Sequence, residues 1–252
     1  MRYLILFLIV VISFVSCEKS NKNEDPKFYE CPVYNGSLLP TVGDSINYNI
    51  DSTTFKSVLN GGHNVTWSFT GLKKQDSIKV YYDDTAGLKY SNSFPFSKYT
   101  STVNNELVYL EETVNGVKVK GAVITAQDTQ FIAVYNTGYN LVNFPLNYND
   151  DITETYFSDD TKYNIFIDIN GVQNAADSLE INRTGTITKK VDGCGTLEMP
   201  NATYDVLRVY KEETVADTVV AHIFVGLGTN AVTVVERETI YKTYEFVTDS
   251  SS

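Results

Sequence analysis

Short runs of alternating apolar and polar residues recur along most of this 252-residue chain. Residues 46–50, 117–120 and 163–170 alternate cleanly, which places their apolar side chains on one face of an extended strand. Further runs are rich in β-branched and aromatic residues without strict alternation; they cover 65–69, 78–82, 107–110, 131–135, 206–210, 219–225 and 231–247. No apolar stripe at helical spacing extends over 11 residues, and only 173–179 favours a short helical turn.

Turn residues separate these runs and predict how the strands connect. Asn115-Gly116 and Asn170-Gly171 tolerate the positive φ that two-residue hairpin loops require. The runs add up to about 11 to 14 strands. This number predicts an all-β fold, either an antiparallel β-sandwich or a partly open barrel, in which Trp67 is a core residue.

The N-terminus predicts export. After Arg2, residues 4–15 are apolar except for Ser13, and as a helix they would span about 18 Å, less than the roughly 30 Å of a bilayer core. Such a run is typical of a signal peptide, and Cys17 directly after the small Ser16 favours lipidation of that cysteine. The alternative is ordinary secretion with cleavage nearby. Acylated Cys17 would anchor the protein stably in the outer membrane, on its periplasmic or cell-surface side.

The chain therefore divides into four expected segments. Residues 1–16 form the lipoprotein signal peptide, and the polar residues 17–30 form a flexible tether. Residues 31–248 form a single all-β domain, and 249–252 form a disordered tail. Twenty basic and 31 acidic residues give a net charge of −11, which would repel a phosphate backbone, so nucleic acid is not an expected partner.

Cys31 and Cys194 form an even pair if Cys17 is acylated. In an oxidising compartment they are candidates for a disulfide that would close a loop of more than 160 residues. The chain-entropy contribution of such a loop is about 4 to 5 kcal/mol. The alternative is two unpaired, buried thiols.

Several blocks resemble a family of secreted and lipid-anchored all-β modules from Bacteroidota, which also forms the N-terminal part of proteins with a sorting domain. The blocks are 42–46, 62–69, 144–150, 192–200 and 204–209. The resemblance implies an extracytoplasmic all-β module and no known catalytic activity. The chain departs from the family at Cys194, where an aromatic residue is usual, and in having no evident C-terminal sorting domain.

Candidate catalytic residues are few. Cys194 with His222 could be drawn as a thiol nucleophile and its base, but no third orienting group is recognisable, so a structural cysteine is favoured. Two histidines cannot build a multi-histidine metal site, and we expect no cofactor. Asp followed by Ser or Thr and a small or aliphatic residue recurs, and it resembles the O-glycosylation acceptor of exported Bacteroidota proteins. The candidate acceptors are Ser45, Ser52, Ser77, Thr85, Ser178 and Thr218. The alternative is that these pairs only connect loops to strands.

The sequence favours a membrane-anchored, non-enzymatic module that binds glycan or protein or forms part of the cell envelope. The alternative is a hydrolase acting on an extracellular glycan or other polymer, and a third hypothesis is a barrel with an interior ligand pocket. Exposed coplanar aromatic residues would indicate the binding module, and two carboxylates facing each other across a cleft would indicate the hydrolase. A closed apolar cavity would indicate the barrel with a ligand pocket.

Overall fold

The computed structural model describes residues 29–36, 41–50, 60–73, 76–103, 106–126, 129–169, 171–225 and 228–248. The predicted signal peptide, Cys17, Ser52 and the predicted tail lie outside these ranges. The strands within them are β1 (Ser45–Ile50), β2 (Gly62–Ser68), β3 (Asp76–Tyr81), β4 (Asp83–Asp84), β5 (Tyr99–Val103), β6 (Glu106–Thr113), β7 (Gly116–Ala126), β8 (Thr129–Asn143), β9 (Asp151–Ile169), β10 (Val172–Glu198), β11 (Thr203–Val225) and β12 (Gly228–Val247). One short 3-10 turn, Ser91–Ser93, is the only helical element of the described part.

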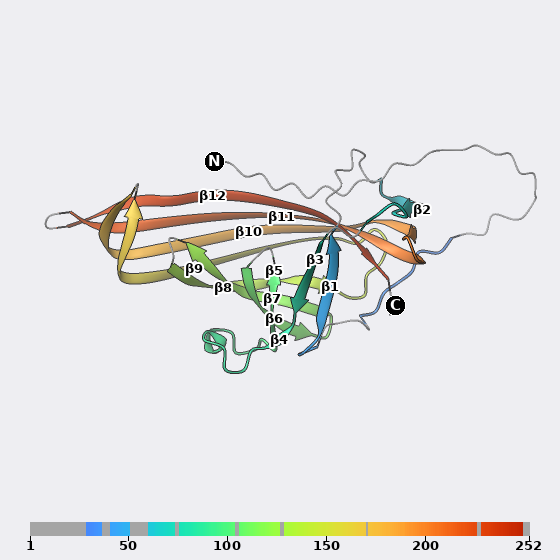
Figure 1. Ribbon diagram of the computed structural model, residues 1–252, viewed down its shortest axis with the longest axis horizontal. Helices are drawn as coiled ribbons and strands as arrows, with labels where there is room; N and C mark the ends of the chain where they lie inside the picture. The colour runs from blue at the N-terminus through green and yellow to red at the C-terminus, as the bar shows by residue number, and fades with distance from the viewer. Residues whose placement is uncertain are drawn as a thin grey trace, which may run out of the picture.

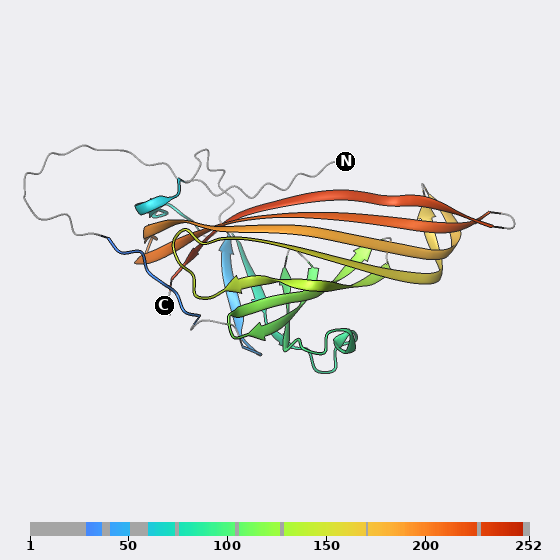
Figure 2. The ribbon, with the colours of Figure 1, turned by 180° about the vertical axis from the view of Figure 1, so that it is seen from behind.

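Two sheets face each other, as Figures 1 and 2 show. The long sheet has the order β12-β11-β10-β2, with β9 paired to the first part of β10, and runs the length of the molecule. The short sheet has the order β4-β5-β6-β7-β8 and covers one face of the long sheet over part of its length. Strands β1 and β3 form a separate two-stranded sheet. All described pairings are antiparallel except that of β10 with β2, and the sheets do not close into a barrel.

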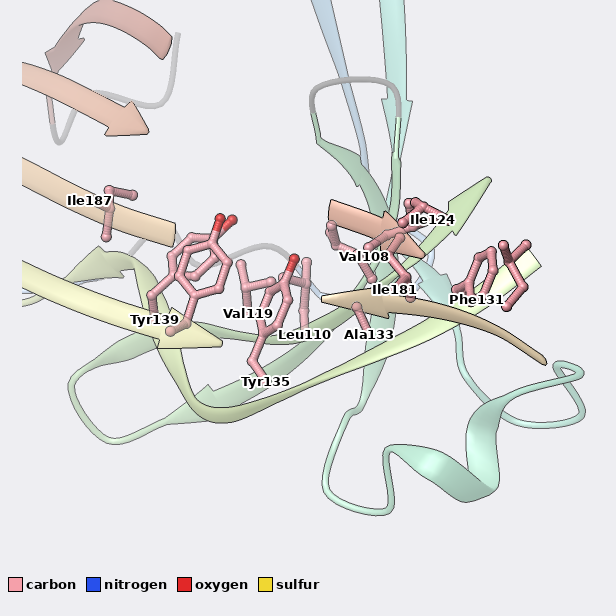
Figure 3. Close-up of a cluster of buried hydrophobic side chains, with 14 of the residues drawn as sticks. Val108, Leu110, Val119, Ile124, Phe131, Ala133, Tyr135, Tyr139, Ile181 and Ile187 are labelled. Atoms are coloured by element: carbon pink, nitrogen blue, oxygen red, sulfur yellow. The ribbon is translucent and has the colours of Figure 1, made fainter. Parts of the chain in front are cut away.

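The register of the long sheet fixes which side chains face the short sheet. In β10, the odd-numbered residues from 179 to 191 are buried, and the pairing places them beside the odd-numbered residues of β11. Because side chains alternate along a strand, one face of the sheet is thus directed into the sandwich. Figure 3 shows Tyr135 and Tyr139 of β8 pointing into the same space, near Ile187 of β10. This apolar layer is the main core.

A second core lies at the end of the long sheet where β10 meets β2. Tyr34, Leu146, Leu207 and Val209 pack around the fully buried Cys194. Tyr29, which falls in the predicted tether, also packs against this cluster. Trp67, 3% exposed, packs nearby with Phe69 and Val206, in agreement with its expected core position.

The structure confirms the all-β sandwich and corrects two local expectations. The hairpin between β6 and β7 turns one residue earlier than expected, at Val114-Asn115, because Thr113 pairs with Gly116, the first residue of β7, which has a φ of 139°. Residues 173–179, expected as a helical turn, belong to β10 and pair with β9, with Ala175 opposite Phe166. Pairing with a neighbouring strand thus overrides the weak helical preference of Ala175 and Ala176.

Candidate ligand-binding cleft

Charged side chains lie on the buried face of the long sheet in three rows of cross-strand partners. Lys189 of β10 lies directly opposite Lys211 of β11. The next row contains Glu154 and Glu213, on either side of Ile187. Two rows further on, the pairing aligns Ser158, Arg183, Asp217 and Arg237 across all four strands.

Arg183 joins the two sheets. The residue is only 3% exposed. Its guanidinium donates from Nε to Asp217 Oδ1 at 2.6 Å and from Nη2 to Asp217 Oδ2 at 2.9 Å. From the short sheet, Glu106 Oε1 accepts from Nη2 at 2.7 Å, and Glu106 Oε2 accepts from Nη1. Nη1 also lies 3.5 Å from the Tyr135 hydroxyl. All five donors of the guanidinium are therefore directed at acceptors, which is the arrangement that a buried arginine requires.

Three tyrosines separate this network from the lysine pair. The ring of Tyr156 lies 4.3 Å from that of Tyr135 and 4.8 Å from that of Tyr139, and its hydroxyl donates to Glu213 Oε1 at 2.9 Å. The ring lies across Gly185, where a Cβ atom would overlap it. Burial is the main cause that raises the pKa of Tyr135 to about 12, so these hydroxyls stay protonated at neutral pH.

A small polar cavity of about 20 Å³ lies among these tyrosines, Arg183 and Glu213. This volume is enough for one water molecule. Glu213 Oε2 is buried and has no hydrogen-bond partner among the described residues. The cavity is too small for a ligand, and we assign it a structural role.

A larger cleft of about 190 Å³ lies beyond the lysine pair, between the end of β8 and the long sheet. Its walls are mainly apolar, and they include four charged residues. The lining residues are Leu141, Val142, Asn143, Phe144, Leu146, Asp150, Ile152, Lys189, Val191, Val209, Lys211, Glu245 and Val247. An apolar cavity of about 150 Å³ is known to take up benzene, so this cleft has room for about seven or eight non-hydrogen atoms.

Lys189 lines this cleft. It is 8% exposed, donates to the carbonyl oxygen of Asn140, and lies 3.4 Å from Asn143 Oδ1 and 3.5 Å from Glu154 Oε2. The pKa of Lys189 is lowered to about 8, mainly by burial and also by Lys211, whereas Glu154 and Glu245 act in the opposite direction.

Cys31 and Cys194 form a disulfide, with their Cα atoms 5.6 Å apart. Their sulfur atoms and a ring nitrogen of His63 all lie within 4.8 Å of one another. The His63 ring lies edge-on between Tyr29 and Tyr148, at 5.8 and 5.9 Å. Thiolates rather than disulfide sulfurs bind zinc, so this group is not a metal site in the oxidised protein.

The structure separates the residues of the hypothetical thiol–histidine pair. Cys194 is opposite Leu207 in β11, 15 residues before His222, which corresponds to about 50 Å along the strand. His222 instead lies 3.3 Å from Glu180. A thiol nucleophile with His222 as its base is therefore ruled out.

The candidate glycosylation sites differ in exposure. Ser45 and Ser77 are exposed, and Thr218 is half-buried within β11. Thr85 and Ser178 are 9% and 5% exposed, and the Thr85 hydroxyl donates to the carbonyl oxygen of Ser97 at 2.9 Å. A glycan needs an accessible hydroxyl, so Thr85 and Ser178 are out of reach in the folded protein.

Exposed aromatic residues and facing carboxylates, the features expected of a glycan-binding surface and of a hydrolase, are present only in part. Three aromatic residues are exposed along β9: Phe157, Tyr163 and Phe166. Phe157 is six residues, about 20 Å, from Tyr163, and Tyr163 is three residues, about 10 Å, from Phe166. These three rings make no contact with one another in the described part of the chain. Glu106 and Asp217 face each other only across Arg183, which binds both. The apolar cleft is the feature that the fold leaves available, although it lies between two sheets and not in a barrel.

Sequence analysis did not identify Arg183, Lys189 or Lys211. Each is a charged residue at an odd position of an otherwise alternating stretch, and this conflict with the period-two pattern was the available signal. No helix of the described ranges is long and apolar enough to cross a membrane. Comparison of the chain with protein-family models, curated proteins and solved structures gives no match.

Proposed function

We propose that the protein is a lipid-anchored extracytoplasmic module that binds a small apolar molecule, without catalysis, in the cleft between its sheets. The observation that carries this proposal is the cleft of about 190 Å³ with mainly apolar walls. Apolar pockets with a few convergent polar groups are typical of small-molecule sites, and well-packed interiors contain few voids of this size.

The position of the cleft agrees with an anchor at Cys17. Leu146, Val191 and Val209 belong both to the cleft and to the cluster around the Cys31–Cys194 disulfide. Cys31 follows Cys17 by 14 residues, which span at most about 50 Å. An acylated Cys17 would therefore keep the cleft within about this distance of the membrane, where apolar molecules are concentrated.

Hexan-1-ol is a suitable neutral probe, because its seven non-hydrogen atoms match the cleft. We expect it to bind the full chain carrying Cys17→Ser, which avoids acylation and detergent, with a Kd in the millimolar range, as expected for burial of about six carbon atoms. Chemical shifts of Val191, Val209 and Leu146 should move on titration. Val209→Trp should abolish the shifts by filling the cleft. Val114→Trp is the matched control, since Val114 is 99% exposed at a hairpin.

No saturable shifts at the cleft, or equal binding by Val209→Trp and the wild type, would contradict ligand binding. The anchor is tested separately by growing the native organism or an expression host with labelled palmitate. Label should enter the wild-type chain and be lost in Cys17→Ser. Retained label in that variant would contradict lipidation at Cys17.

A further inference from the structure

The two lysines that line the cleft, Lys189 and Lys211, differ in their hydrogen-bond partners. Lys189 and Lys211 lie directly opposite each other on neighbouring strands, and such cross-strand partners have Cβ atoms about 5 Å apart. Two like charges at this distance destabilise the fold unless anions compensate them. The partners of the two lysines therefore determine which charge the cleft favours.

Glu154 compensates Lys189, at 3.5 Å from its Nζ, and the carboxylates near the lysines also accept hydrogen bonds from neutral groups. Glu154 accepts from the Asn140 side chain at 2.8 Å and from its backbone N–H at 3.1 Å. Glu213 Oε1 accepts from Tyr156. The ion pair between Lys211 Nζ and Glu213 Oε2 spans 3.8 Å, which is longer than a hydrogen bond.

The ammonium of Lys211 has N–H donors that no described residue accepts. Its side chain is only 12% exposed, and its ammonium makes no hydrogen bond among the described residues. Lys189, in contrast, donates to the Asn140 carbonyl and is held against β8. The Lys211 ammonium lines the cleft and keeps access to solvent, so its donors are available either to water or to an acceptor on a bound ligand.

The two acidic residues of the cleft do not compete for a cation. Asp150 Oδ2 accepts from the backbone N–H of Asn147 at 2.8 Å and from its side chain at 3.3 Å, within its own turn. Glu245 is exposed on the outermost strand, β12, where water solvates it. The polar group that the cleft can satisfy is therefore an anion beside Lys211.

We infer that the ligand is an amphipathic monocarboxylate whose apolar end fills the cleft and whose carboxylate accepts hydrogen bonds from Lys211, beside the charge of Lys189. This inference rests on the proposed function and adds the chemical class of the ligand. A single negative charge fits best, because Glu154, Glu213 and Glu245 lie around the lysines and the chain carries a net charge of −11. A phosphate dianion would meet stronger repulsion from these carboxylates.

Three six-carbon probes test the inference on the full chain carrying Cys17→Ser: hexanoate, hexan-1-ol and hexylammonium. We expect hexanoate to bind about tenfold more tightly than hexan-1-ol, the ratio that corresponds to one charge-assisted hydrogen bond. Hexylammonium should bind most weakly. These three measurements on one protein need no variant.

Lys211→Met provides the second test. It should weaken hexanoate binding about tenfold and change hexan-1-ol binding less than twofold, whereas Lys211→Arg should retain most of the preference for hexanoate. Lys242→Met is the matched control, because Lys242 is half-exposed, lies 3.1 Å from Glu212 and does not line the cleft.

The outcomes distinguish the inference from the function on which it rests. If hexan-1-ol binds at the cleft but hexanoate binds no better, or if hexylammonium binds best, the inference is overturned and the apolar site stands. Unchanged hexanoate binding in Lys211→Met would overturn it in the same way. If none of the three probes binds, both proposals fail.

Discussion

Removing the guanidinium of Arg183 should destabilise the protein strongly. Arg183→Met keeps a side chain of similar length but takes away five directed donors. Its two carboxylate partners then differ in what they can do. Glu106 has a side chain 26% exposed and can turn to water, whereas the Asp217 side chain is 4% exposed and cannot.

The magnitude follows from Asp217. Leaving one partner of a buried ion pair without its counterion costs about 3–5 kcal/mol. Arg237, with a side chain 56% exposed, still pairs with Asp217 and offsets part of this cost. We therefore expect the free energy of unfolding to fall by about 3 kcal/mol, the lower end of that range. Arg237→Met alone should cost less than about 1 kcal/mol, because its ion pair is solvated.

Urea unfolding, followed by fluorescence and circular dichroism, measures this difference. The double variant Arg183→Met/Asp217→Leu is the informative companion, because removing both buried charges should return stability to within about 1 kcal/mol of the wild type. A loss below about 1 kcal/mol in Arg183→Met would refute a buried network. A double variant as unstable as the sum of its single changes would refute the coupling of the two residues.

Three other changes test different parts of the structure. Gly185→Ala should lower the unfolding free energy by about 1–3 kcal/mol in the same urea assay, because the new methyl group overlaps the buried Tyr156 ring; an unchanged value would contradict that packing. The pKa of Lys189 is lowered to about 8 in the folded protein from 10.5, so the unfolded chain binds more protons between these values and stability rises with pH across this window. Relative to Lys189→Met, the wild type should gain about 2 kcal/mol between about pH 7 and 9.5, and parallel pH profiles of the two proteins would disprove the shift. The disulfide closes a loop spanning 163 residues, so Cys31→Ser/Cys194→Ser should cost about 2–5 kcal/mol, and intact mass should rise by two hydrogens on reduction of the wild type alone; free thiols in the unreduced wild type would exclude the bond.

Local signals in the sequence predicted most strands and the approximate places of the turns. Gly171 lies between β9 and β10 with a φ of 83°, as its place in a predicted turn requires, because glycine tolerates positive φ. The turn between β6 and β7 is shifted by one residue from Asn115-Gly116, because strand pairing extends to Gly116. Trp67 is buried, as its size and apolar character indicated. Such features can be predicted without knowledge of the partner strand.

The 27-residue strand β10 was only partly foreseen. Its buried face carries Arg183, Gly185 and Lys189 among aliphatic residues, and these interrupt the alternation that identifies a strand. Their burial is explained only by groups on other strands: Glu106 and Asp217 for Arg183, the Tyr156 ring for Gly185 and the Asn140 carbonyl for Lys189. A single sequence does not contain this register.

The cleft could not be predicted for the same reason. Its walls come from the end of β8 and the residues that follow it, 141–146, and from three strands of the long sheet. The long-sheet segments are 189–191, 209–211 and 245–247. Each segment has an ordinary strand composition. Only the cross-strand register places Lys211 beside Lys189 and directs both into an apolar space.

Intermolecular nuclear Overhauser effects between the hexyl protons of bound hexanoate and protein methyl groups would locate the ligand in the Cys17→Ser chain. The cleft predicts contacts to Val191, Val209 and Leu146, with the carbon next to the carboxylate nearest to Lys211. Contacts confined to exposed side chains such as Phe166 or Phe224, or no contacts at saturating hexanoate, would contradict binding between the sheets.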